Sequence, residues 1–228
     1  MGIAERRERE REELRTRIVE AARDILSAEG LDALSIRAIA ERIEYSPATI
    51  YLYFRDKDEL IREVVKAGFM RLAEYIERAV AELGPEANPA DQFGATGRAY
   101  ARFAVENTAY FRVMFELPKV PRLDCHPPAE ADPLPPCDAD LVTLVTRAKE
   151  AGLMKVGDPA QAALIGWGAM HGLASLYLSG HLAPEVQGPE QFAELIEAAL
   201  VTLWEGWKAE GSGDAEEERG GRAAAANV

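Results

Sequence analysis

Cysteine and histidine are scarce in this sequence. Only 2 cysteines and 3 histidines occur among its 228 residues. Two cysteines cannot build the disulfide framework of a small secreted domain, so we expect a protein of the reducing cytoplasm. With so few histidines there is no zinc-protease pattern, and neither a phosphate-binding glycine loop nor a Gly-x-Ser-x-Gly segment occurs. The sequence therefore predicts neither an enzyme nor a resident cofactor.

The few soft metal ligands lie near one another in a proline-rich segment. Cys125, His126 and Cys137 fall in or beside the loop expected between Pro118 and Pro136. Two thiols and an imidazole can bind a soft metal or form a redox switch, but their spacing matches no standard zinc pattern and the fourth ligand is lacking. We predict no metal site, and a thiol- or metal-responsive protein stays an alternative.

Positive charge is also scarce. The sequence has 26 Lys and Arg against 39 Asp and Glu, a net charge of −13, which argues against a general nucleic-acid coat but not against a small DNA-reading surface. The first residues contain no apolar stretch, so no secretory signal is expected. Residues 159–184 carry no Asp, Glu, Lys or Arg and are long enough to span a bilayer. Polar residues within this segment and the lack of basic flanks favour a buried interface helix instead.

Helical periodicity runs through the chain, and no segment shows the period-two alternation of a strand. We therefore predict an all-α fold. Gly30 is expected to end the first helix, and Asp56 with Glu59 to form a capping box at the start of the fourth. The tail from residue 211 is expected to be disordered. The expected helices cover residues 5–29, two short segments after Ser35 and Ser46, and residues 56–83, 90–107, 108–117, 138–151, 159–180 and 188–208.

The two short helices predict a helix-turn-helix. Ser35 and Ser46 are good N-caps, and Pro47 suits the first position of a helix because its missing N–H costs nothing there. A helix with small residues at its N-terminus can enter a DNA major groove, which is about 12 Å wide. Pro47 and Ala48 cannot hydrogen-bond a base through their side chains, so readout there would favour thymine methyl groups and DNA shape.

Three segments combine spacing and residue types in a specific way: Leu34-Ser-Ile-Arg-Ala-Ile-Ala40, Ser46-Pro-Ala-Thr-Ile-Tyr-Leu-Tyr-Phe54 and Lys57-Asp-Glu-Leu60. Together they resemble the TetR/AcrR family of transcriptional regulators. The resemblance implies a three-helix DNA-binding domain over residues 1–56, of which residues 1–13 form a charged arm. It also implies a helical ligand-binding and dimerisation domain over residues 57–210, followed by an acidic tail over 211–228. Arginine and glutamate alternate in the arm, which favours a self-paired solvated helix over a minor-groove arm.

The resemblance also implies which residues contact DNA. Phosphate contacts are implied for Ser35, Tyr51 and Lys57, although Tyr51 could instead pack on the fourth helix and Lys57 could be a solvated first-turn residue. Base or groove contacts are implied for Arg37, Pro47, Ala48, Thr49 and Leu52. Ser46 and Tyr53 complete the predicted DNA-binding set.

The sequence departs from the family at the turn. The family usually has glycine where Glu44 stands, a small aliphatic residue where Tyr45 stands, and a histidine pair in place of Leu52 and Tyr53. A carboxylate near DNA phosphates would weaken binding. Together with the net charge, this motivates an alternative function, a helical ligand-binding or interaction protein of the same fold that does not bind DNA.

The C-terminal half contains Trp167-Gly-Ala-Met-His-Gly172, which is similar to the Trp-His-Gly signature of one TetR subgroup. Glycine costs up to about 1 kcal/mol in a helix interior, so Gly168 and Gly172 need a packing reason such as the close approach of another helix. The resemblance implies a four-helix dimer interface. Its other members, on one side of the last helix, are Phe192, Leu195, Ile196, Ala199, Leu203 and Trp207.

Aromatic, methionine and histidine side chains of the middle helices are candidate ligand contacts, although each of them could be plain core. Such a set suits a hydrophobic or aromatic effector. The resemblance thus implies a cytoplasmic homodimer that binds a pseudo-palindromic DNA duplex and is released by a small apolar effector, most simply a repressor. The candidate ligand residues are Phe103, Tyr110, Phe111, Met114, Phe115, Trp167, Met170 and His171.

Overall fold

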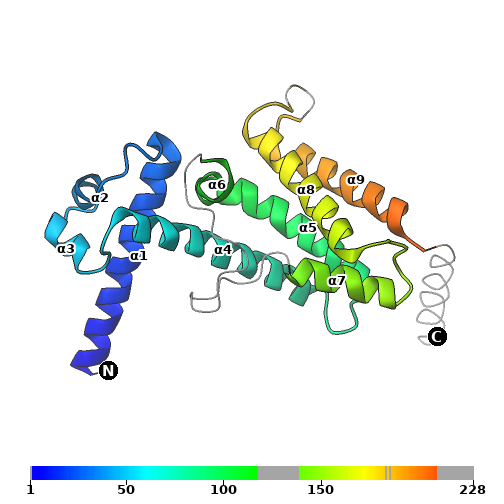
Figure 1. The fold of residues 1–228 in the computed structure, drawn as a ribbon, viewed down its shortest axis with the longest axis horizontal. Helices are drawn as coiled ribbons and strands as arrows, with labels where there is room; N and C mark the ends of the chain where they lie inside the picture. Colours follow the sequence, from blue (N-terminus) through cyan, green and yellow to red (C-terminus); the bar gives the residue numbers. More distant parts are fainter. Residues whose placement is uncertain (1, 118–138, 183, 185, 210–228) are drawn as a thin grey trace, which may run out of the picture. The chain divides into compact units, whose positions relative to one another are not determined.

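The computed structural model describes residues 2–117, 139–182, 184 and 186–209, and every regular element in these ranges is helical (Figure 1). The all-α prediction is therefore confirmed for the described residues. The proline-rich segment with Cys125, His126 and Cys137, and the tail from residue 211, lie outside them. The helices are α1 (Ile3–Glu29), α2 (Ile36–Arg42), α3 (Pro47–Tyr51), α4 (Lys57–Glu82), α5 (Pro89–Glu106), α6 (Thr108–Phe111), the π-helix η1 (Arg112–Glu116), α7 (Ala139–Glu150), α8 (Pro159–Leu178) and α9 (Pro189–Trp207).

The described helices form two compact units. The first contains α1, α2, α3, the part of α4 up to Ala73, and the pair α6 and η1. The second contains α4 from Glu74 onward, nearly all of α5, and α7, α8 and α9. This division follows packing, and the functional boundary expected after residue 56 stays a prediction.

The predicted helix ends are confirmed where the sequence supplies a cap. Gly30 ends α1 with a φ of 84°, a backbone conformation that favours glycine. The Oγ atoms of Ser35 and Ser46 accept hydrogen bonds from the backbone N–H groups of Ala38 (3.1 Å) and Thr49 (3.2 Å). These two caps fix where α2 and α3 begin, because each satisfies an amide that has no partner within its helix.

The capping box at the start of α4 differs from the prediction by one residue. Asp56 Oδ1 accepts from the Glu59 N–H at 2.7 Å, as expected. The Glu59 carboxylate, however, accepts from the N–H of Arg55 at 2.7 Å rather than from that of Asp56. This backbone hydrogen bond lowers the pKa of Glu59.

The segment 108–117 is not one α-helix. It divides into the single turn of α6 and the π-helix η1, which pack against α1 and α4 in the first unit. The ring of Phe115 meets that of Phe69 edge-on at 6.0 Å, and the Arg23 guanidinium lies 4.8 Å from the centre of the Tyr110 ring. Over so few residues, the apolar periods of an α-helix and of a wider π-helix cannot be told apart from the sequence.

In the second unit, α8 packs against both α7 and α9 (Figure 1). The rings of Tyr177 on α8 and Phe192 on α9 stack at 4.2 Å. A Cβ on Gly166 would lie 2.9 Å from the ring of Phe93, which itself meets Trp207 edge-on at 5.8 Å. Gly166 is therefore the α8 glycine that allows close packing within the unit. None of the described helices is long and apolar enough to cross a membrane.

Candidate nucleic-acid interface

The N-terminal tip of α3 is solvent-exposed on a well-anchored helix. Ile50 and Phe54 are 0% and 1% exposed and fix α3 and the residues after it in the core of the first unit. Ser46, Pro47 and Ala48 face solvent at the other end. The Oγ of Ser46 lies 2.9 Å from the Oγ1 of Thr49, so these two hydroxyls pair with each other at the tip. The arrangement presents small side chains outward, as a helix that enters a DNA groove requires.

Two larger side chains extend this exposed surface. Tyr51 is 59% exposed and Leu52 is 76% exposed, whereas Tyr53 is half-buried. The alternative that Tyr51 packs against α4 is therefore wrong. The exposed ring of Tyr51 and the exposed side chain of Leu52 are consecutive in the chain and lie directly after the polar tip of α3.

The remaining predicted contacts flank α3. Ser35 and Arg37 are exposed at the N-terminus of α2. Lys57, the first residue of α4, is half-buried, and its Nζ donates a 2.5 Å hydrogen bond to the carbonyl oxygen of Leu31. The alternative that Lys57 is merely solvated is thus wrong. An ammonium has two further donors, so this bond does not use up its capacity for a phosphate.

The turn between α2 and α3 contains an acidic residue in a left-handed conformation. Glu44 has a φ of 62° and is exposed. Its N–H donates to the Glu41 carbonyl at 3.3 Å, and the Tyr45 N–H donates to the Ala40 carbonyl at 2.9 Å. These two bonds form a Schellman motif, whose left-handed position favours glycine. The structure thus explains in physical terms why the family usually has glycine here.

Tyr45 is a surface residue that was not among the predicted contacts. It is 41% exposed beside the α3 tip, and the guanidinium of Arg17 lies 5.5 Å from its ring centre. Arg17 also donates from Nη2 to the carbonyl oxygen of Ile43 at 3.3 Å. The unusual aromatic at this position was the available signal, but nothing in the sequence indicated that Arg17 pairs with it.

The candidate ligand residues do not gather in one unit. Tyr110, Phe111, Met114 and Phe115 belong to the first unit, and Phe103, Trp167, Met170 and His171 to the second. Phe111, Phe103 and Met170 are 0%, 0% and 3% exposed.

In the second unit, a polar side-chain pair involves the candidate ligand residue His171. Tyr100 Oη and His171 Nδ1 share a hydrogen bond of 2.8 Å, and the Trp167 ring lies 5.2 Å from that of His171. Burial lowers the pKa of His171. Tyr100 was missed at the sequence level, because a partner 71 residues away leaves no local pattern.

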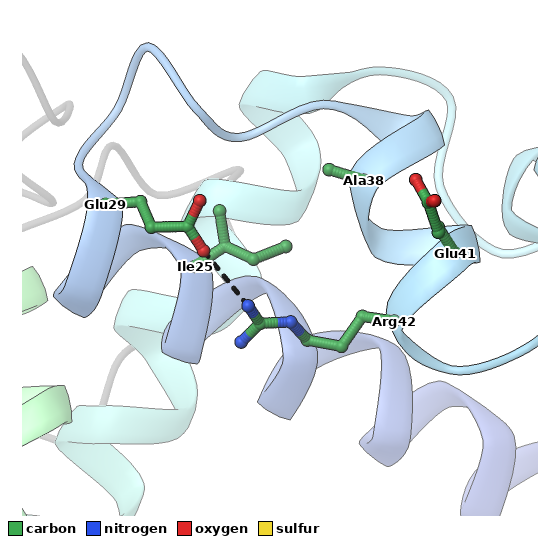
Figure 2. A pocket seen from close by; sticks show the side chains of 5 residues that line it. All are labelled: Ile25, Glu29, Ala38, Glu41 and Arg42. Atoms are coloured by element: carbon green, nitrogen blue, oxygen red, sulfur yellow. Dashed lines mark hydrogen bonds and ion pairs between the residues drawn. The ribbon is translucent and has the colours of Figure 1, made fainter.

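Two surface pockets lie away from the candidate ligand residues. One is between α1 and α2, where the Arg42 guanidinium reaches the Glu29 carboxylate at 3.0 Å above the buried side chain of Ile25 (Figure 2). The other is formed by residues 187–191 at the start of α9. Neither contains a candidate ligand residue.

The candidate dimer residues fall into two groups. Phe192 and Ile196 are 3% and 2% exposed within the protomer, so the expectation that they face a partner is corrected: they already pack in the core. Leu195, Ala199, Leu203 and Trp207 are half-buried. By contrast, a Cβ on Gly168 or Gly172 would meet no described atom within 4 Å.

The geometry defines a helical protein with an anchored helix-turn-helix in its first unit. Family models agree: residues 18–64 match the description "Bacterial regulatory proteins, tetR family", and residues 93–203 match "Tetracyclin repressor-like, C-terminal domain". The chain belongs to the TetR family of bacterial regulatory proteins.

Individual relatives agree with this assignment. The chain is 30% identical over 108 residues to an HTH-type transcriptional regulator of Mycobacterium bovis, a match that covers 47% of this chain and 46% of that protein. The chain thus spans about half the length of the curated relatives it matches. A Rhodococcus protein of unknown function superposes with a TM-score of 0.68 at 30% identity, over 86% of this chain and 95% of that one. A TetR-family transcriptional regulator of Haemophilus influenzae superposes with a TM-score of 0.65 at 20% identity, over 87% and 98%.

Proposed function

We propose that this chain is a cytoplasmic transcriptional regulator that binds double-stranded DNA through α2 and α3. The observation that carries the proposal is the α3 tip, where Ser46, Pro47 and Ala48 are exposed while Ile50 and Phe54 hold the helix in place. The tip enters the major groove, where Arg37, Thr49 and Leu52 contact bases or the groove wall. Ser35, Tyr51 and Lys57 contact phosphates of the adjacent backbone, and the half-buried Tyr53 completes the set.

The test is selection of duplexes by the purified full chain, followed by footprinting of the selected sequence at about 100 mM salt. We expect protection of a pseudo-palindrome. Tyr51→Ala should weaken binding at least tenfold, whereas Tyr51→Phe should retain most of it if the ring contacts sugar or phosphate edges. No protection and no preferred duplex would overturn the proposal.

The regulator acts as a homodimer in this proposal, and an exposed stripe of α8 supports it. Leu164, Gly168, Gly172 and Leu176 recur every four residues, so they share one face of α8. The two leucines are 63% and 44% exposed, and the glycines between them have open space. Such a stripe lets the α8 of a second copy approach closely, and Val201 on α9, 58% exposed, would extend the contact.

Sedimentation of Leu164→Glu and Gly168→Leu variants tests the dimer. Both should shift the protein toward the monomer, and Glu194→Gln, on the exposed surface of α9, serves as a control that should not. A dimer that is unchanged in both variants would place the interface elsewhere. Because a two-fold dimer presents two copies of α3, the monomeric variants should also lose operator binding.

Release from DNA by a small apolar effector, and hence a repressor role, completes the proposal. In the second unit the Tyr100–His171 pair could hydrogen-bond a polar group of such a molecule next to the Trp167 ring. Screening aromatic and aliphatic acids, ketones and esters for loss of the footprint tests this. Effectors that release the wild type from DNA but do not release the Tyr100→Phe variant would support this effector site. Membership of the Trp-His-Gly subgroup stays a prediction.

A second candidate function is a ligand-binding or interaction protein that does not bind DNA. It is favoured by the exposed Glu44 carboxylate in the helix-turn-helix and by the net charge of −13. It predicts dimers that bind small molecules and show no duplex preference even at low salt. Duplex selection therefore distinguishes the two functions.

A further inference from the structure

The N-terminal arm of α1 has two chemically different faces. Residues 2–13 are all exposed, and in Figure 1 the first turns of α1 extend beyond the labelled helices of the first unit. On one face the arginines are paired within the helix: Arg6 with Glu10 at 3.4 Å and Arg9 with Glu13 at 3.5 Å. These pairs occupy i and i+4 positions and offset each other's charge.

The other face of the arm continues the core stripe of α1. Ile18, Ala22 and Ile25 are 0%, 0% and 2% exposed and point into the first unit. At 3.6 residues per turn, the same stripe runs N-terminally through Leu14 to Arg11 and Arg7. Within the described part of the chain, neither Arg7 nor Arg11 forms an ion pair or a side-chain hydrogen bond. The unpaired guanidinium groups of Arg7 and Arg11 therefore lie about one helical turn apart, on the exposed continuation of the face that is buried further along α1.

The stripe emerges beside the predicted DNA-reading surface. Arg17, the last arginine before the buried part of α1, donates to the Ile43 carbonyl in the turn that leads into α3. Arg15 is held by Glu63 at 2.8 Å and lies over the ring of Phe54. With a rise of about 1.5 Å per residue, Arg11 and Arg7 lie about 9 and 15 Å beyond Arg17 along the same rigid helix.

From this geometry we infer that Arg7 and Arg11 form a second DNA contact, in which they bind phosphates that flank the stretch read by α3. The inference rests on the proposed function, because it needs the duplex to lie at the α3 tip. Guanidinium groups bind phosphate bidentately, and the pairing of Arg6 and Arg9 leaves the charge of the other face available. Glu8 lies about 100° round the helix from Arg7 and about 60° from Arg11, and Glu12 lies about 140° and 100° from them; all four side chains are exposed.

Matched double variants of the full chain test the inference. Arg7→Gln with Arg11→Gln removes the unpaired face, and Arg6→Gln with Arg9→Gln removes the same charge from the paired face. Gln and Arg have similar helix propensities, so circular dichroism should show equal helix content. The dissociation constant for the selected duplex and for an unrelated duplex is measured between about 50 and 200 mM salt.

We expect the Arg7/Arg11 variant to bind at least tenfold more weakly on both duplexes and its log–log salt slope to fall by about 2, since each lost phosphate contact removes about 0.9. The Arg6/Arg9 variant should keep a slope within about 0.5 of the wild type. If the wild type binds and the two variants lose affinity equally, or neither changes, the arm contact is overturned and the proposed function stands. If the wild type prefers no duplex at any salt, the proposed function fails and the arm contact with it.

Discussion

The guanidinium of Arg17 lies 5.5 Å from the ring centre of Tyr45, and it joins the first long helix to the turn between α2 and α3. The same side chain donates to the Ile43 carbonyl, so one residue of α1 holds both the side chain and the backbone of this turn. The orientation of α3 therefore depends on α1 as well as on the anchors Ile50 and Phe54.

Removing this contact should destabilise the first unit. Tyr45→Leu should lower the free energy of unfolding by about 0.5–1 kcal/mol, the usual strength of a partly exposed cation–π contact. Urea denaturation checks this value, with Tyr45→Phe as the control that keeps an aromatic face. Equal stability of the Leu and Phe variants would mean that the ring contact contributes nothing.

Replacing Glu44 should stabilise the turn. Its left-handed backbone costs a side-chain-bearing residue about 1 kcal/mol relative to glycine, so Glu44→Gly should raise the free energy of unfolding by about that amount. Glu44→Gln keeps the Cβ and removes only the charge, so it should leave stability nearly unchanged. DNA affinity should not follow the same ranking as stability. If the Glu44 carboxylate faces DNA phosphates, Glu44→Gly and Glu44→Gln should both bind more tightly than the wild type, because each removes the negative charge. A Gly variant no more stable than the Gln variant would contradict the strain argument.

Two glycines of α8 should respond in opposite ways to alanine. Gly166→Ala should destabilise the protein by about 1–3 kcal/mol, because the new methyl group meets the buried ring of Phe93. Gly168→Ala meets open space in the protomer, so in the monomeric Leu164→Glu background it should stabilise the helix by up to about 1 kcal/mol. Denaturation and sedimentation together check this pair. Destabilisation of the monomer by Gly168→Ala would contradict the open space seen beside it.

Acid should weaken the second unit through His171. Burial lowers the pKa of this imidazole in the folded protein, so below about pH 6.5 the unfolded chain binds the proton more readily than the folded one. The contribution of neutral His171 to the free energy of unfolding is therefore present above that pH and is lost as the pH falls. The loss is no more than about 1.4 kcal/mol per pH unit. The loss of stability between about pH 7.5 and 5.5 should be smaller in His171→Gln than in the wild type. An unchanged difference would show that other groups carry the pH dependence.

Local signals in the sequence predicted most of the fold. Ser35, Ser46 and Gly30 set helix ends through hydrogen bonds or backbone angles that span a few residues, and such effects can be recognised in the sequence. Glu44 was noted as unusual by comparison with the family, and the structure supplies the reason. Most of the predicted DNA-contact residues lie between Ser46 and Lys57, and all of these are exposed or half-buried on or next to α3.

Long-range relationships could not be predicted in the same way. The Tyr100–His171 hydrogen bond joins two helices with no shared pattern. Likewise, the roles of the α8 glycines depend on which neighbour approaches each one: Gly166 meets Phe93, while Gly168 meets nothing. The apolar stripe of α9 was visible, but the sequence could not show that Phe192 and Ile196 face their own protomer.

The uninterrupted helix of α1 has a consequence for the length of the N-terminal segment. Because α1 continues from its exposed arm into the core without a break, the direction of each arm side chain around the helix axis is determined by its distance in sequence from the core. One inserted residue between Glu13 and Leu14 would swing the side chains beyond it by about 100° around the axis. Seven inserted residues would restore nearly the original direction and advance the tip by about 10 Å. Each inserted or deleted residue therefore rotates the arm by a fixed angle of about 100° relative to the core. Two proteins that differ in length by one residue here would turn different faces of the arm toward the same neighbour.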